Sequence, residues 1–262
     1  MVKKVAFDKP PVVEVACGAG FDLSQRLTAG HIGLFWQTVE SEFPNIDEVS
    51  PLPPPQRPDA VTIELSNLPP LARTWLSSED GSRLMQLQGD RFIYNWKRQE
   101  DDDQYPSFDM VYKEFQECLG RFLKFLEHYK ISKPDFRYLE LQYVNHIGNS
   151  NGLQDVGKAG VLVDHTRLES KDRFLPAPTA YNWQSQYPMP DDTGLLTITA
   201  QTAISRATGG ELLRLDMSTR GSPKEDTAES FDKWFELAHD WIVQGFCDIT
   251  VPELHKIWMR TR

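Results

Sequence analysis

The sequence contains little of what marks secreted or membrane proteins. Its three cysteines, Cys17, Cys118 and Cys247, are scattered and form no CxxC pair, so we expect no disulfide framework and a reducing compartment. No apolar run approaches the ~20 residues that a membrane-spanning helix needs, and residues 1–10 lack the apolar stretch of a secretory signal. We therefore expect a cytoplasmic protein with no membrane contact.

Dense positive charge is lacking as well. The 262-residue chain has a formal net charge of -10, and Lys97–Arg98 runs directly into the acidic stretch Glu100–Asp103. An acidic chain without a basic stripe repels a phosphate backbone, so we expect no nucleic-acid binding. An acidic surface instead favours a basic protein partner.

Familiar catalytic and metal-binding motifs are also missing. No GxSxG, P-loop or HExxH sequence occurs in the chain. His239-Asp240 and Asp164-His165 lack the third and fourth ligands that a metal site requires. Cys17 lies in an apolar run, which is more typical of a small core residue than of a nucleophile. We predict no catalytic residue, no metal and no cofactor.

The sharpest local motif is VVEVACGAG at Val12–Gly20. It resembles the first motif of S-adenosylmethionine-dependent methyltransferases, in which a strand runs into a glycine turn beside the cofactor. That family needs a parallel sheet, whereas hairpins follow here, and parallel strands cannot be joined by two-residue turns. A buried strand that ends in a glycine turn is therefore the favoured interpretation.

What the sequence does contain is a regular pattern of strands, tight turns and amphipathic helices. Apolar alternation and apolar runs predict strands over residues 12–17, 61–65, 84–88, 92–96, 136–147, 195–204 and 211–219. Apolar residues spaced by three and four predict helices over Ser24–Phe43, Phe108–Tyr129 and Phe231–Gly245. Gly89-Asp90 and Thr208–Gly210 predict strand-joining turns, and Pro51–Pro58 an extended connector.

This order of elements predicts an α+β fold with antiparallel sheets backed by long amphipathic helices. The sequence of strand, hairpin-connected strands and long helix occurs twice, which predicts a two-fold internal duplication. We expect a first α+β half over residues 1–132 and a second over residues 133–262, packed as one compact unit. Thr250 and Glu253 predict a capping box for a short last helix.

Four residues of the first half are candidates for a recognition surface. Trp36 and Trp96 are the tryptophans of interest, and His31 and Arg91 lie near them in the sequence. Trp and Arg contribute disproportionately to binding energy at interfaces, so we expect exposed contacts here. The competing interpretation places both tryptophans in the core, because they fall on a helix stripe and in a strand.

One strand of the second half carries two further candidates. Glu140, Gln142 and His146 alternate along the predicted strand and therefore share one face. Such a face can line a ligand pocket, with His146 titrating near neutrality. The favoured interpretation for an antiparallel sheet is that this face simply meets solvent.

Five stretches spread over nearly the whole chain are similar to segments of one bacterial protein family. They are PPVVEVACGAGF (Pro10–Phe21), HIGLFWQ (His31–Gln37), LMQLQGDRFIYNW (Leu84–Trp96), LQYVNHI (Leu141–Ile147) and AHDWIVQGFCDITVPELHKIW (Ala238–Trp258). The family is uncharacterised, sporadically distributed and of similar length, and the resemblance implies no activity or catalytic residue. Its patchy distribution is typical of accessory genes that travel with mobile or defence cassettes, CRISPR-linked ones included.

Together these features predict a non-enzymatic protein-binding or adaptor protein. We expect it to be an accessory component of a bacterial defence or stress system, acting through a protein partner. The alternative is a small-ligand-binding protein or an enzyme, with a pocket over Glu140–His146 or at Gly18–Gly20. If the protein is an enzyme, an S-adenosylmethionine-dependent methyltransferase is the first class to test.

Overall fold

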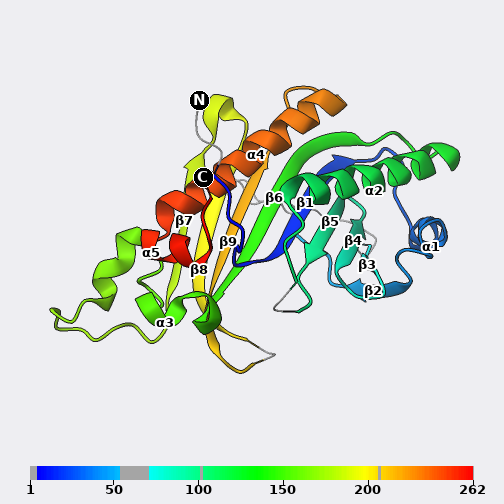
Figure 1. Cartoon of the computed structure of the whole chain (residues 1–262). Helices are drawn as coiled ribbons and strands as arrows, with labels where there is room; N and C mark the ends of the chain where they lie inside the picture. Colours follow the sequence, from blue (N-terminus) through cyan, green and yellow to red (C-terminus); the bar gives the residue numbers. More distant parts are fainter. Residues whose placement is uncertain (1–4, 54–70, 101–102, 206–207, 262) are drawn as a thin grey trace. The chain divides into compact units, whose positions relative to one another are not determined.

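A computed structural model describes residues 5–53, 71–100, 103–205 and 208–261 as a mixed α+β fold (Figure 1). The nine strands in this part of the chain pair in the order β2-β3-β4-β5-β1-β6-β9-β8-β7. The pairs β2–β3, β3–β4, β4–β5, β6–β9, β9–β8 and β8–β7 are all antiparallel. The predicted α+β class with antiparallel pairing is confirmed.

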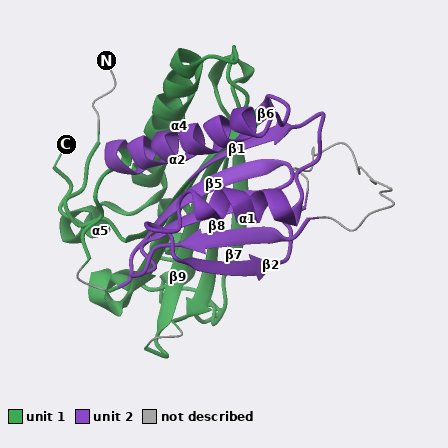
Figure 2. Cartoon of the chain, turned by 90° about the vertical axis from the view of Figure 1, so that its right-hand side faces the viewer, with its two compact units in different colours: residues 1–16, 100–108, 138–262 green, residues 17–99, 109–137 purple. Residues whose placement is uncertain are grey.

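The chain divides into two compact units (Figure 2). Unit 1 comprises Met1–Ala16, Glu100–Phe108 and Tyr138–Arg262, and unit 2 comprises Cys17–Gln99 and Asp109–Arg137. Strands β1 (Val12–Asp22) and β6 (Asp135–Gly148) each contribute residues to both units. A division into halves at residues 132 and 133 stays a prediction.

Unit 2 contains a meander of four strands with two helices. Its elements are α1 (Ala29–Gln37), β2 (Asn45–Val49), β3 (Arg73–Ser77), β4 (Arg83–Gln88), β5 (Arg91–Lys97) and most of α2 (Phe108–His128). Strands β4 and β5 form the predicted hairpin around Gly89-Asp90, since Gln88 pairs with Arg91 across the turn. The register fixes which side chains share a face: Tyr94 lies opposite Met85, whereas Gln86 lies opposite Ile93.

Phenylalanine rings form the core of unit 2. Phe122 of α2 stacks on Phe92 of β5 with ring centroids 5.6 Å apart. It also contacts Phe35 of α1 at 5.4 Å and Phe21 of β1 at 5.9 Å. The apolar stripe of α2 therefore meets one side of the sheet, which explains why residues spaced by three and four are apolar there.

Unit 1 combines four long strands with one long helix. Besides β6, its main elements are β7 (Asn182–Pro188), β8 (Leu195–Ile204), β9 (Glu211–Gly221), α4 (Ala228–Ile249), α3 (Leu153–Val156) and α5 (Pro252–Ile257). Helix α4 runs along β8 and β9 (Figure 1). A Cβ on Gly245 of α4 would lie 3.3 Å from both Leu196 and Met217, so glycine permits this close approach.

The glycine turn predicted at the end of the first strand is wrong. Strand β1 continues without a break from Val12 to Asp22, so Gly18 and Gly20 lie inside it. Ala19 and Phe21 are buried, and their packing extends the strand past the GxG sequence. The segment therefore lacks the strand-to-turn geometry of the methyltransferase motif.

Two helix predictions also need correction. The helix predicted over Ser24–Phe43 is confined to α1, because the Thr28 side chain accepts a hydrogen bond from His31 N and so caps the helix start. The capping box predicted from Thr250 and Glu253 is wrong: Val251 occupies the N-cap of α5. The Thr250 hydroxyl instead donates to Phe246 O at 2.5 Å.

The apolar pattern does not reveal every strand of the fold. Strands β2, β3 and β7 were missed, since none of them shows a long apolar alternation. The strand predicted over residues 61–65 and most of the connector at 51–58 lie outside the described residues. Among the helices that are described, none has the length and apolar character needed to cross a membrane.

Candidate functional site

The first two candidate residues, His31 and Trp36, both serve the local structure of α1. His31 Nδ1 accepts a hydrogen bond from Thr28 N at 3.2 Å and completes the capping contact at the helix start. Trp36 is half-buried, and its Nε1 donates to Phe43 O at 3.0 Å. We infer that both side chains stabilise α1 and the chain that follows it.

Arg91 and Trp96 lie at opposite ends of β5 and, five residues apart, on opposite faces of the sheet. Arg91 is only 2% exposed. Its guanidinium forms an ion pair with Asp90 at 2.9 Å and donates to Pro53 O at 3.0 Å. The expectation that Arg91 is an exposed contact is wrong, because these partners bury it. Trp96 is half-buried on the same face as Tyr94.

The structure does place Glu140 and His146 on one face of β6, together with Gln142. Glu140 accepts a hydrogen bond from Arg220 at 2.8 Å, and His146 lies opposite Arg214 in the register of β6 and β9. Burial, followed by the charge of Arg214, lowers the pKa of His146, so its ring is neutral at neutral pH.

This polar face continues across unit 1 in regular rows. One row contains Gln142 of β6, Ser218 of β9, Thr197 of β8 and Gln186 of β7. Its charged groups are largely paired, since Arg214 also contacts Asp216 at 2.8 Å. The face can thus form many polar contacts while carrying little net charge.

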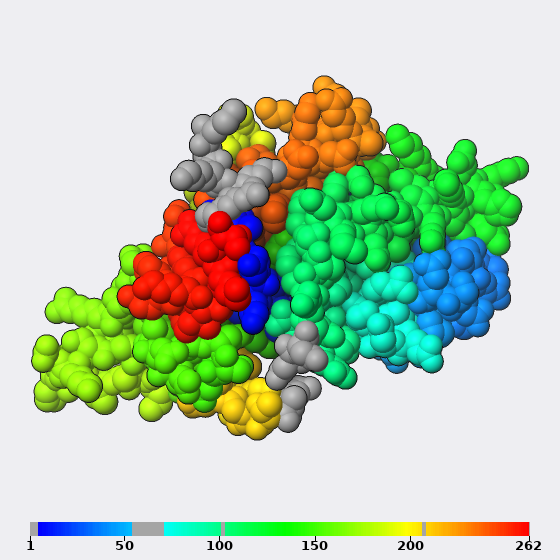
Figure 3. All heavy atoms as spheres, in the orientation of Figure 1, coloured from blue at the N-terminus to red at the C-terminus, as the bar shows by residue number. Residues whose placement is uncertain are grey.

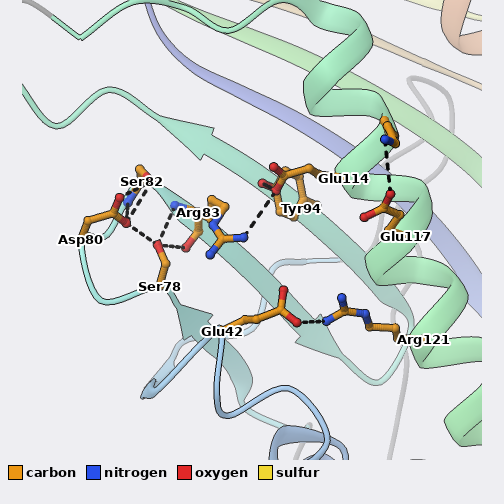
Figure 4. Close-up of polar contacts among 10 residues, drawn as sticks. Glu42, Ser78, Asp80, Ser82, Arg83, Tyr94, Glu114, Glu117 and Arg121 are labelled. Atoms are coloured by element: carbon orange, nitrogen blue, oxygen red, sulfur yellow. Dashed lines mark hydrogen bonds and ion pairs between the residues drawn. The ribbon is translucent and has the colours of Figure 1, made fainter.

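A polar cluster in unit 2 is the most obvious place to look for chemistry (Figure 4). The Tyr94 hydroxyl donates to the Glu114 carboxylate at 2.5 Å, and Arg83 lies 3.9 Å from the same carboxylate. Burial and the hydrogen bond to Glu114 raise the pKa of Tyr94 far above its ordinary value. The phenol therefore acts as a fixed donor and not as a base.

The remaining members of the cluster also have structural partners. Arg121 of α2 forms an ion pair with Glu42 at 2.6 Å, which ties the helix to the segment after α1 (Figure 4). Ser78 and Ser82 both donate to the Asp80 carboxylate and lower its pKa, as in a hydrogen-bonded turn.

The cysteines of the chain are held as thiols. Burial raises the pKa of Cys118 to about 12. Cys17 is fully buried, as predicted for a core residue, and its pKa is raised by the same cause. Burial also raises the pKa of the half-buried Cys247. Nucleophilic cysteines need the opposite shift, because the thiolate is the reactive form.

The two histidine–aspartate pairs in the sequence lie in structural settings. His239 stacks on Phe108, with ring centroids 4.2 Å apart. His165 Nδ1 lies 2.7 Å from the Tyr181 hydroxyl. Within the described parts of the chain, no group of three or more His, Cys, Asp or Glu side chains could hold a metal ion.

An apolar loop of unit 1 is the most exposed feature that sequence reasoning missed. Phe174 is fully exposed and Leu175 is 58% exposed. The loop is nevertheless tied at both ends: Arg173 donates to Leu168 O at 3.1 Å, and Lys158 donates to Thr179 O at 3.2 Å. The space-filling view shows the yellow-green segment that contains this loop at the left margin (Figure 3).

The strand that follows this loop is an edge strand. Strand β7 ends the strand order, so no other described strand pairs with its outer edge. Its sequence, NWQSQYP, has no charged residue, whereas β2 at the other end of the order contains Asp47 and Glu48. Charged side chains commonly protect strand edges from pairing, and β7 lacks that protection.

We define the contact surface as Phe174, Leu175 and the outer edge of β7. Exposed apolar side chains and unpaired strand edges are each typical of places where another polypeptide binds. The only signal in the sequence was an apolar dipeptide between Arg173 and Pro176, without strand or helix periodicity.

Comparisons with known proteins add little to this geometry. No family model matches the chain, and no curated protein matches it. Among solved structures, the chain is similar to the di-domain ARO/CYC StfQ of the steffimycin biosynthetic pathway. That match has 9% identity and a TM-score of 0.18, over 94% of this chain and 97% of the other. A similarity this weak carries no argument about fold or function.

Proposed function

We propose that the protein is a non-enzymatic binding protein that engages another protein through the contact surface. The observation that carries the proposal is the full exposure of Phe174 in a loop that is anchored at both ends. Burying one phenylalanine side chain is worth about 2 kcal/mol, which the free chain does not gain here. A partner that covers Phe174 and Leu175 would recover that free energy.

The titration behaviour of the polar groups supports binding over catalysis. The thiol of Cys118 and the phenol of Tyr94 are both held protonated, and the ion pairs of the Figure 4 cluster link structural elements. Groups that act as nucleophiles or bases are usually tuned toward reactivity. The pKa values of Cys118 and Tyr94 are instead raised, which disfavours the reactive, deprotonated forms.

The partner is expected to be basic. The chain has a formal net charge of -10, so an acidic field surrounds it at neutral pH. Such a field speeds encounter with a basic protein and makes association weaker as salt rises. The loop itself contributes little to this field, because Lys171, Asp172 and Arg173 carry charges of both signs.

Site-specific photo-crosslinking in the native host tests this proposal. A photoreactive amino acid is placed at Phe174 in one protein and at Met110 in a second one. Met110 is a matched control, since it is also apolar and 56% exposed but lies on α2. The proposal predicts one recurring crosslinked protein from position 174 and none from position 110. Equal labelling from both positions would refute a specific contact surface.

Small-ligand binding over the polar face of unit 1 is the second proposed function. It is supported by the half-buried row of Gln142, Ser218 and Thr197 beside the neutral His146. A methyltransferase is less favoured, because β1 runs straight through its glycines within an antiparallel order. Calorimetry with S-adenosylmethionine separates the two: saturable binding that is lost in Gly18→Val would favour the methyltransferase.

We further propose that the fold arose by internal duplication, with each copy backed by its long helix. The support is the order of elements: β1, β3, β4, β5 and α2 in one copy correspond to β6, β7, β8, β9 and α4 in the other. In both copies the first strand lies beside the fourth in the strand order. A sequence profile built from homologues should align the two copies in this register, and a different register would refute duplication.

The biological setting remains a proposal that rests on the family resemblance. We propose an accessory role in a bacterial defence or stress system, in the cytoplasm. The genes beside this one in the source genome test it: recurrent defence or CRISPR genes would support the role, and unrelated neighbours would not.

A further inference from the structure

One face of the sheet in unit 2 gathers positive charge around a tryptophan. Side chains alternate along strands, so the register places Trp75 of β3, Gln86 of β4 and Ile93 of β5 on one face. Arg73 lies two residues before Trp75 in β3, and Lys97 lies four residues after Ile93 in β5. Both side chains therefore share this face. The opposite face carries the rings that pack on α2, including Phe92.

The two cations converge on the same indole ring. The guanidinium carbon of Arg73 lies 5.5 Å from the Trp75 ring centroid, and the Lys97 ammonium lies 4.9 Å from it. Gln86 Oε1 accepts hydrogen bonds from Arg73 at 3.0 Å and from Trp75 Nε1 at 3.1 Å. The Gln86 amide in turn donates to Asn95 Oδ1 at 2.7 Å. Gln86, itself fixed by Asn95, thus holds both Arg73 and Trp75 in place.

No carboxylate balances these two cations among the described residues. Neither Arg73 nor Lys97 forms an ion pair there, and Arg73 Nε is buried without a hydrogen-bond partner. The nearby Arg91 is already paired with Asp90, and Asp47, which faces Trp75 from β2, is exposed at the sheet edge. Burial, followed by the charge of Arg91, lowers the pKa of Arg73.

We propose that this face binds an oxyanion, a carboxylate or a phosphate, held by Arg73 and Lys97 beside Trp75. An indole ring attracts cations but offers them no hydrogen-bond acceptor, so the donors that face away from Gln86 are still unused. A guanidinium fork matches the two oxygens of a carboxylate or phosphate, and the Lys97 ammonium adds a point charge. The Gln86–Asn95 amide pair fixes the orientation of the fork.

Calorimetric titration of the full chain with inorganic phosphate, and separately with acetate, tests the site. Ionic strength is held constant with sodium chloride, so that general screening does not imitate binding. The site predicts saturable binding of at least one of the two anions with a stoichiometry of one. The anion that binds more tightly identifies the ligand as a phosphate or as a carboxylate.

Charge-matched variants locate the binding. Arg73→Gln and Lys97→Gln should each weaken the affinity about tenfold or more, as expected for the loss of a charge-assisted contact. Lys113→Gln also removes one positive charge from unit 2 but lies on the exposed side of α2, and it should change the affinity less than about twofold. Arg73→Lys keeps the charge and loses the fork, so it should bind with intermediate affinity.

Melting temperatures guard against trivial loss of folding in these variants. If Arg73→Gln unfolds, Lys97→Gln and Lys113→Gln still provide the comparison. No saturable heat with either anion in the wild-type protein would overturn the proposal. Equal affinities in Lys97→Gln and Lys113→Gln would overturn it as well. This site is independent of the contact surface, so neither result bears on protein binding.

Discussion

Two phenylalanines of this chain have opposite environments. Phe122 is fully buried and contacts the rings of Phe21, Phe35 and Phe92, whereas Phe174 is fully exposed. The first lies at the centre of a packed core, and the second lies on a loop fixed by hydrogen bonds at its ends. The same side chain therefore stabilises the fold in one place and is available to a partner in the other.

Phe122→Ala should have the largest effect on stability. Removing a ring with three aromatic neighbours leaves a cavity that the core cannot fill, and such changes cost about 3–5 kcal/mol. Urea unfolding followed by circular dichroism measures this loss. A decrease below about 1 kcal/mol would mean that the core of unit 2 is not packed as described.

Tyr94→Phe should have a smaller effect. The variant keeps the buried ring but removes the hydroxyl that donates to Glu114 at 2.5 Å. Because the Glu114 side chain is partly exposed and Arg83 remains near it, we expect a loss of about 1 kcal/mol in the free energy of unfolding. Glu114→Gln in the Tyr94→Phe background should add little, and a large additional loss would contradict the pairing.

The pH dependence of stability should reveal the lowered pKa of His146. Its pKa is lowered in the folded protein, so the unfolded chain binds a proton at higher pH than the folded one does. The contribution of the neutral His146 to the free energy of unfolding is therefore fully present above the ordinary histidine pKa of about 6.5, and it is lost as the pH falls below that value. His146→Gln should flatten the decrease in unfolding free energy between pH 7 and pH 5. An unchanged slope would show that His146 titrates normally.

The smallest change in stability is expected for Phe174→Ala. An exposed side chain loses no buried contact when it is truncated, so the free energy of unfolding should change by less than about 0.5 kcal/mol. A melting curve recorded beside that of Phe122→Ala measures the difference directly. A large destabilisation would mean that Phe174 packs against other parts of the chain in solution.

The sequence predicted those elements whose residues follow a simple period. Helix α2 was found from its apolar stripe, and the β4–β5 hairpin from Gly89-Asp90. Strand β2 was missed because Asn45–Val49 is mostly polar and exposed, as an edge strand can be. The predicted duplication and the division into halves stay predictions.

The candidate site was harder to predict, because burial depends on residues distant in the sequence. Arginine is a residue type common at exposed contacts, yet Arg91 is buried. Its guanidinium is paired with Asp90 and donates to the carbonyl of Pro53, 38 residues earlier in the chain. Phe174 is the opposite case, because a phenylalanine is most often a core residue, yet this one is fully exposed. No local pattern distinguishes these two outcomes.

The most direct test of the account measures the affinity of the crosslinked partner for three purified proteins: wild type, Phe174→Ala and Met110→Ala. The account predicts that Phe174→Ala weakens binding by about 2 kcal/mol, roughly thirtyfold, while its melting temperature stays at the wild-type value. Met110→Ala, which removes an equally apolar exposed side chain from α2, should bind as the wild type does. Equal affinity of all three proteins would contradict the claim that the loop is the contact surface.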